Sequence, residues 1–137
     1  MSLLADLAEK YENPQVDMGY VYLMEFKFKQ GKTYTTLYKV GVTVNEPIDR
    51  MLQINRSFFM SRRYMPECRI VRMRKTVDYF GKEKALHSLL SEYNYVFKKS
   101  FDGSTEFFDI DLEYIDKAFC DVVPKLSDVV IHSKLPK

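Results

Sequence analysis

Apolar and aromatic residues recur at every second position over residues 20–29, which read YVYLMEFKFK. Polar residues occupy the other side of this segment from Glu25 onward. A period of two is typical of a β-strand. After the turn sequence QGKT, residues 34–42 have the same character, so residues 20–42 predict an antiparallel hairpin. The expected apolar side of the first strand consists of Tyr20, Tyr22, Met24, Phe26 and Phe28.

Three later segments have the apolar spacing of helices. The first spans 45–60, with Asn45 as its expected N-cap and Pro47 in its first turn. The second spans 78–97 and carries the clearest helical pattern, and the third spans 112–123. The predicted apolar stripe of the first helix consists of Ile48, Met51, Leu52 and Phe59.

A third strand is predicted over residues 67–75, and a short helix is predicted over residues 3–11. The order of elements indicates an α+β fold, with a small three-stranded antiparallel sheet flanked by helices. One side of the third strand is predicted to carry Cys68 and Ile70, together with Arg72. We divide the chain into an N-terminal helical extension, a main domain, and a C-terminal helix and tail packed on that domain, at 1–18, 19–110 and 111–137.

The composition is that of an ordinary globular protein of 137 residues, with 46% hydrophobic and 29% charged residues. The two cysteines, Cys68 and Cys120, have no metal-binding spacing, which favours a reducing compartment. The first residues contain acidic side chains and no long apolar run, unlike a signal peptide or membrane anchor. These features predict a cytoplasmic protein without a membrane partner.

Charge is unevenly distributed along the chain, although the net charge is only +2. The segment from Arg56 to Lys75 contains six Arg and one Lys but a single acid, Glu67, and it also contains aromatic residues. Such a mixture suits nucleic-acid binding, whereas a solvated basic surface is the alternative interpretation. The candidate nucleic-acid ligands are Arg56, Arg62, Arg63, Arg72, Arg74 and Lys75.

Several short motifs follow one another in a fixed order. The first strand opens with YVY at 20–22, the second ends with YKVG at 38–41, and Arg50 lies on the next helix. Glu83 follows in KEKALHSLL, and GSTEFF spans 103–108. This order resembles the GIY-YIG nuclease superfamily, in particular its bacteriophage and large-virus branch, in which a Lys stands in the second motif. The resemblance covers roughly residues 19–110.

The resemblance implies a site for phosphodiester hydrolysis. It places Tyr22, Lys39 and also Tyr20 beside the attacking water, Arg50 on the scissile phosphate, and Glu83 on one divalent ion, Mg²⁺ or Mn²⁺. Three further residues complete the expected site. At Gly41 the backbone is expected to approach the phosphate. His87, one turn after Glu83, is expected either to support the site from behind its ligands or to handle protons. Glu106 is an acid with either a site role or a structural role.

The sequence also departs from the superfamily pattern. Tyr20 stands where the first motif has Gly, the spacer between the two strand motifs is long, and only Asn94 is available as the late Asn. Each candidate taken alone also fits a structural role, such as a core aromatic residue or a Lys whose head group reaches solvent. The ordered combination favours the site.

The leading hypothesis is a metal-dependent DNA endonuclease from a phage or mobile element. RNA is an alternative substrate, and a double-strand break would require a homodimer or two sequential cuts. The second hypothesis is a catalytically inactive DNA-binding regulator with the same fold. The third is an interaction protein with no nucleic-acid ligand.

Overall fold

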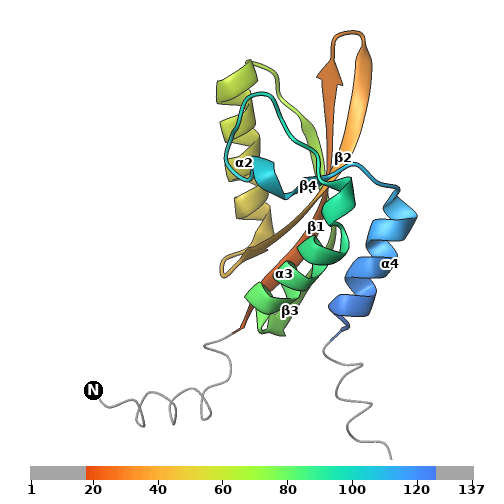
Figure 1. The fold of residues 1–137 in the computed structure, drawn as a ribbon. Coiled ribbons are helices and arrows are strands. Elements are labelled where there is room, and N and C mark those ends of the chain that lie inside the picture. Colours follow the sequence, from red (N-terminus) through yellow and green to blue (C-terminus); the bar gives the residue numbers. More distant parts are fainter. Residues whose placement is uncertain (1–17, 126–137) are drawn as a thin grey trace, which may run out of the picture.

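The computed structural model describes residues 18–125, and the predicted helix at 3–11 lies outside them (Figure 1). The first two strands form the predicted hairpin, whose turn contains Gly31 at a φ of 61°. The elements in chain order are β1 (Met18–Gln30), β2 (Thr33–Thr43), α2 (Pro47–Arg62), β3 (Glu67–Val77), α3 (Tyr79–Leu89), the 3-10 turns η2 (Ser91–Tyr93) and η3 (Ser104–Glu106), β4 (Phe107–Phe108) and α4 (Leu112–Val122).

The strands form one antiparallel sheet in the order β3-β1-β2-β4, which confirms the α+β class. The sheet has a fourth strand that the sequence did not predict. Its two residues, Phe107 and Phe108, pair with Lys39 and Tyr38 of β2. None of the helices between residues 18 and 125 combines the length and the apolar character needed to cross a bilayer.

Helices cover both faces of the sheet (Figure 1). The period of two in β1 directs Tyr22 and Phe26 to the face covered by α2, and Val21 and Leu23 to the face covered by α3 and α4. Both sides of the centre of β1 are therefore buried. We call these two sides the α2 face and the α3–α4 face.

Helix α2 buries a different stripe from the predicted one. Its N-cap is Glu46 rather than Asn45, and Pro47 is its first residue. Ile48 and Leu52, predicted to face the core, are about half exposed. A helix rotated by part of a turn keeps the same spacing, so the sequence pattern could not choose between the two stripes. The buried residues of α2 are Pro47, Met51, Ile54 and Phe58.

Strand β3 contains a bulge that changes which face of the sheet its side chains occupy. Ile70 pairs with Met24, whereas Arg72 pairs with Leu23, so Val71 is an additional residue in the ladder. Such a bulge moves every later side chain to the opposite face. Arg72 therefore lies on the α3–α4 face, and the prediction that it shares a side with Cys68 and Ile70 is wrong.

Helix α3 ends at Leu89 and does not extend to residue 97 as predicted. The backbone N–H of Tyr95 donates to the carbonyl of Phe107 at 2.9 Å, and the N–H of Asp109 donates to the carbonyl of Tyr93 at 2.8 Å. These bonds hold residues 93–95 beside β4. Pairing with the sheet thus replaces the last turns of the predicted helix.

Gly41 is a position where any side chain would collide with the core. A Cβ atom there would lie 2.5 Å from the Tyr22 hydroxyl oxygen and 2.6 Å from the ring carbon that carries it. Tyr22 is buried and cannot withdraw, so the substitution would force the two strands to shift.

We expect Gly41→Ala to lower the free energy of unfolding by about 1–3 kcal/mol. The matched control is Gly81→Ala in α3, whose Cβ would lie 2.5 Å from the Asp78 carboxylate. Asp78 is exposed and can move, and Ala favours a helix over Gly, so this variant should be neutral or more stable. Chemical denaturation measures both, and an equal loss in the two variants would contradict the assignment.

Candidate active site

Lys39 is fully buried on the α2 face of the sheet, opposite Met24 in β1. Its ammonium group forms an ion pair with the carboxylate of Glu106 in η3. Burial lowers the pKa of Lys39, and the negative charge of Glu106 partly offsets this effect. A buried ammonium group without such a partner would lose its charge or destabilise the fold.

Tyr22 lies next to Lys39, with the ammonium nitrogen 5.7 Å from the centre of the Tyr22 ring. Its hydroxyl group is buried and has no hydrogen-bond partner among the described residues. Burial raises the pKa of this hydroxyl well above its ordinary value, while the positive charge of Arg50 acts in the opposite direction. Tyr22 is therefore a neutral phenol at physiological pH. The absence of a side chain at Gly41 leaves the space that this hydroxyl occupies.

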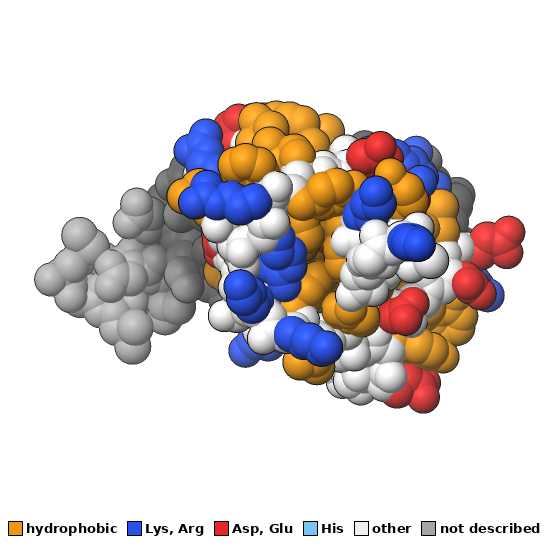
Figure 2. Space-filling view, turned by 90° about the horizontal axis from the view of Figure 1, so that it is seen from above, with side chains coloured by type: hydrophobic (Ala, Val, Ile, Leu, Met, Phe, Trp, Pro, Cys, Tyr) orange, Lys and Arg blue, Asp and Glu red, His pale blue; other side chains and the backbone are white. Residues whose placement is uncertain are grey.

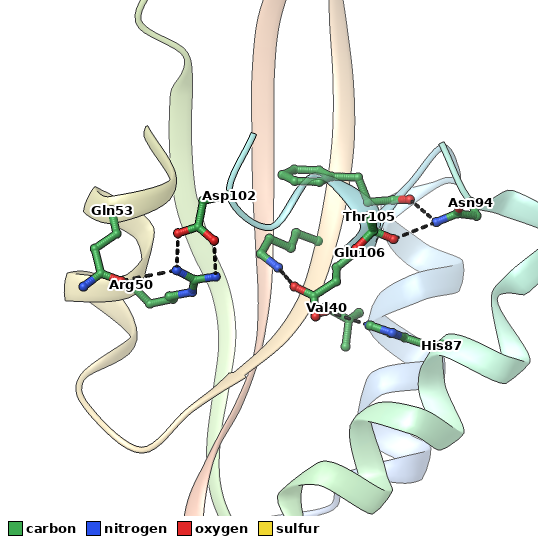
Figure 3. A network of polar contacts seen from close by, with 10 residues as sticks. Val40, Arg50, Gln53, His87, Asn94, Asp102, Thr105 and Glu106 are labelled. Carbon is green, nitrogen blue, oxygen red and sulfur yellow. Dashed lines mark hydrogen bonds and ion pairs between the residues drawn. The ribbon is translucent and has the colours of Figure 1, made fainter. Parts of the chain in front are cut away.

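Arg50 extends from α2 toward the same region and forms a two-bond ion pair with Asp102 (Figure 3). Its Nη1 lies 2.7 Å from one Asp102 carboxylate oxygen, and its Nη2 lies 3.1 Å from the other. Nη1 also donates to the side-chain oxygen of Gln53 at 3.3 Å. The pair raises the pKa of Arg50 and lowers the pKa of Asp102 through these hydrogen bonds.

Two acids and a histidine lie on the side of Lys39 away from Arg50 (Figure 3). One ligand atom from each of Glu83, His87 and Glu106 lies within 4.8 Å of the others. Nε2 of His87 lies 2.8 Å from the Val40 carbonyl, which only accepts, so the neutral ring carries its proton there and keeps Nδ1 as an acceptor (Figure 3).

The pKa of Glu83 is raised above its ordinary value. Its Oε2 atom is buried and has no hydrogen-bond partner among residues 18–125. Burial, followed by the negative charge of Glu106, raises the pKa of Glu83 to about 7. Carboxylate and imidazole groups arranged in this way could hold a divalent cation.

The segment from Phe101 to Glu106 supplies the acidic partners of both Lys39 and Arg50. The ring of Phe101 lies among those of Phe26, Phe58, Phe97 and Phe107, with ring centres 4.8–6.2 Å apart. Gly103 allows the chain to turn at a φ of 82°, where most side chains would be strained. The side-chain amide nitrogen of Asn94, Nδ2, donates to the backbone carbonyls of Thr105 and Phe107 (Figure 3).

The structure brings most of the sequence-predicted site residues together, but not all of them. Tyr20 is two residues from Tyr22 on the same strand and is partly exposed, in a separate shallow groove that also contains Lys75. Those that meet around Lys39 are Tyr22, Gly41, Arg50, Glu83, His87 and Glu106.

The predicted nucleic-acid ligands do not form one surface. Arg72 forms an ion pair with Asp116 of α4, and Arg74 contacts Cys120, both on the α3–α4 face. Lys75 lies opposite Tyr20 in the sheet. The bulge in β3 is the physical reason for this separation. Arg56 and Arg63 are exposed on α2 and at its C-cap.

A second group of cations lies at the hairpin end of the molecule. Figure 2 views this end from above and shows Lys and Arg side chains around a hollow lined by hydrophobic groups. A groove of about 740 Å³ lies there, and Arg62 lines it together with three lysines. The Arg62 guanidinium group lies over the rings of Phe58, Phe97 and Phe101 at 4.7–5.4 Å. The three lysines are Lys29, Lys98 and Lys99.

Asp102 and Gln53, which hold Arg50, were not among the predicted site residues. The Asp102-Gly103 dipeptide signals a turn, but nothing in the sequence indicates that its carboxylate meets a residue 52 positions earlier. The group formed by Lys29, Lys98 and Lys99 was not predicted either, because these residues come from two segments that are distant in sequence.

A comparison with models of protein families matches residues 19–123 to the T5orf172 domain. The chain belongs to the T5orf172 domain family. The T5orf172 domain is phage-associated and occurs in some nuclease-like proteins. Its match extends beyond residue 110 and includes α4. Neither the curated proteins nor the solved structures contain a match to this T5orf172 chain.

The ion pair between Lys39 and Glu106 predicts an asymmetric pair of variants. Glu106→Gln should lower the free energy of unfolding by about 3 kcal/mol, because it leaves a fully buried ammonium group without its partner. Lys39→Met should cost less, because the Glu106 side chain is 28% exposed and can be solvated. The double variant should be more stable than Glu106→Gln alone. Chemical denaturation measures the cycle, and additive losses would contradict a direct pair.

The raised pKa of Glu83 predicts how stability depends on pH. The folded protein binds this proton up to about pH 7 and the unfolded chain only to about pH 4.5, so stability should fall as pH rises between these values. Glu83→Gln should remove this decrease, which is on the order of 2 kcal/mol. Denaturation in EDTA at pH 5 and pH 8 measures the effect. Identical pH dependence in both proteins would show that Glu83 ionises normally.

Proposed function

We propose that this T5orf172 domain is a metal-dependent DNA endonuclease of the GIY-YIG type, which hydrolyses a phosphodiester bond. The observation that carries the proposal is that four side chains meet in one place. They are two cations, a buried tyrosine and a buried glutamate whose Oε2 has no hydrogen-bond partner between residues 18 and 125. Phosphodiester hydrolysis requires positive charge at the phosphoryl oxygens and an ordered water molecule. The family's association with nuclease-like proteins supports the same proposal.

Arg50 is the proposed phosphate ligand, and Lys39 is proposed to supply positive charge near it. Arg50 is partly exposed, with 24% of its side chain accessible, so an incoming phosphate can reach it. Its planar guanidinium group can donate two parallel hydrogen bonds to phosphate oxygens. Lys39 lies deeper and contributes positive charge without direct exposure to solvent. In a site of low polarity this charge acts more strongly on the phosphate than it would in water.

Glu83 is the proposed principal metal ligand, with Glu106 and His87 beside it. The donor set fits a single divalent ion, since the buried Oε2 of Glu83 has no hydrogen-bond partner among the described residues and lies close to two further ligand atoms. Oxygen ligands favour Mg²⁺, and the nearby imidazole also suits Mn²⁺. Such an ion, when bound, supplies positive charge to the phosphoryl and leaving oxygens. Its binding would also favour the ionised form of Glu83.

Tyr22 is the proposed residue that positions the attacking water. Its hydroxyl is buried and has no partner among the described side chains, so it can accept and donate a hydrogen bond to a water molecule there. Because burial keeps the phenol protonated, it orients the water rather than carrying negative charge.

A DNA-binding regulator without nuclease activity is the second candidate function. The observation that favours it is the group of exposed cations at the hairpin end, which lies outside the candidate active site. These cations could bind the DNA backbone whether or not cleavage follows.

Conversion of supercoiled plasmid tests the proposal, with Mg²⁺, Mn²⁺ or EDTA in parallel reactions. We expect metal-dependent nicking by the wild type and none by Glu83→Ala, and a loss of about 10²–10³-fold in rate for Arg50→Ala. The matched controls are Glu113→Ala and Lys117→Ala, two exposed residues of α4 that should cut normally.

A gel shift at two salt concentrations, performed in EDTA, separates the two candidate functions. Salt-sensitive binding without cutting by any of these proteins would support the regulator and reject the nuclease. Neither binding nor cutting would reject both. Normal cutting by Glu83→Ala would show that the metal ligand is misassigned.

A further inference from the structure

Asp102 and Gln53 occupy specific hydrogen-bond donors of Arg50. A guanidinium group has five N–H donors, two on each Nη atom and one on Nε. Asp102 accepts from both Nη atoms across the end of the group, and Gln53 accepts the second donor of Nη1. Among the described residues no acceptor forms a hydrogen bond of ordinary geometry with the two remaining donors, on Nε and Nη2, although the Tyr22 hydroxyl lies near the guanidinium group. These two donors share one edge of the guanidinium plane, which is a geometry that binds phosphate oxygens in pairs.

The orientation of Arg50 matters for the proposed site because Arg50 lies near the Tyr22 hydroxyl. The positive charge of Arg50 opposes the effect of burial on the pKa of Tyr22, as expected of two groups that lie close together. A long arginine side chain on a helix surface has several rotamers of similar energy. An anchor is therefore needed to keep one edge of the guanidinium group available at this place.

Asp102 is held firmly enough to act as that anchor. Its backbone N–H donates to the hydroxyl of Ser57 at 2.9 Å, which ties the loop to α2. Phe101 precedes it and packs into the aromatic core, and Gly103 follows it in a left-handed turn. Loop displacement would break this packing, so Asp102 does not resemble a carboxylate that yields its place to an incoming phosphate.

We propose that Asp102, assisted by Gln53, is a positioning residue that fixes Arg50 with its Nε and Nη2 edge directed toward the substrate phosphate. This inference rests on the proposed function and adds two residues to it. Asp102 acts only through Arg50, and does not itself contact the phosphate. Gln53, whose single bond is longer at 3.3 Å, contributes the smaller part.

The variant Asp102→Asn tests this role, because the amide keeps the shape but replaces one acceptor oxygen and removes the charge. We expect plasmid cleavage with Mg²⁺ to fall about 10-fold to 100-fold, as for a misplaced catalytic group, while DNA binding in EDTA changes little. The matched control is Asp49→Asn, an exposed residue next to Arg50 in α2, which should cleave normally. Cleavage by Asp102→Asn at or above the wild-type rate would overturn the inference, and a faster rate would identify Asp102 as a competitor of phosphate.

A double-mutant cycle separates positioning from a general structural effect. In the Arg50→Ala background, Asp102→Asn should cause no further loss of cleavage, because the residue through which it acts is absent. An equal loss in both backgrounds would mean that Asp102 acts on the fold or on DNA directly, and would also overturn the inference.

An NMR titration distinguishes failure of this inference from failure of the proposed function. The Arg50 Nε–H signal, assigned through its loss in Arg50→Lys, is followed as inorganic phosphate is added to the wild type and to Asp102→Asn. We expect the signal to shift in the wild type and to require about tenfold more phosphate in the variant. If the wild type does not cut DNA, this difference would still support the inference. Equal midpoints, or no shift in the wild type, would overturn it.

Discussion

The buried ion pair of Lys39 and Glu106 is the interaction on which the arrangement of the site depends. Removing an ammonium group from water costs several kcal/mol unless a carboxylate and good packing compensate. Lys39 is fully buried in the middle of a strand, so the chain must bring an acid to it. The turn η3 does this, and β4 follows it directly and pairs with β2 beside Lys39. Gly103 is part of the same requirement, because a Cβ there would lie 3.1 Å from the Lys39 side chain.

The same segment joins the packing of the core to the geometry of the candidate site. Phe101, its first residue, and Phe107, directly after it, both lie against Phe26 in the core on the α2 face. Between them, Asp102 meets Arg50 and Glu106 meets Lys39. Both cations are thus held by one short piece of chain whose ends are fixed by aromatic packing. Positioning of this kind, established during folding, avoids a cost of ordering when a ligand binds.

Patterns of local origin made part of this structure predictable. The period of two predicted the hairpin, and the order of motifs indicated which distant residues meet. The bulge at Val71 could not be predicted, because one additional residue in a ladder leaves no signature in composition. The α2 stripe and the end of α3 are decided by tertiary packing. The partner of Arg50 is likewise a property of the folded loop rather than of any motif.

The charges of the candidate site indicate that its two proposed ligands would assist each other. Lys39 and Arg50 each have an acid, Glu106 and Asp102, whereas the buried Oε2 of Glu83 has no partner among the described residues. A phosphate alone would bring further negative charge to a region that already contains three carboxyl groups. A divalent cation alone would face two positive side chains. The two together balance these charges, so the binding of either should favour the other, and this coupling must be reciprocal. Under the proposed function, the buried carboxyl of Glu83 is thus the element that makes metal binding and DNA binding interdependent.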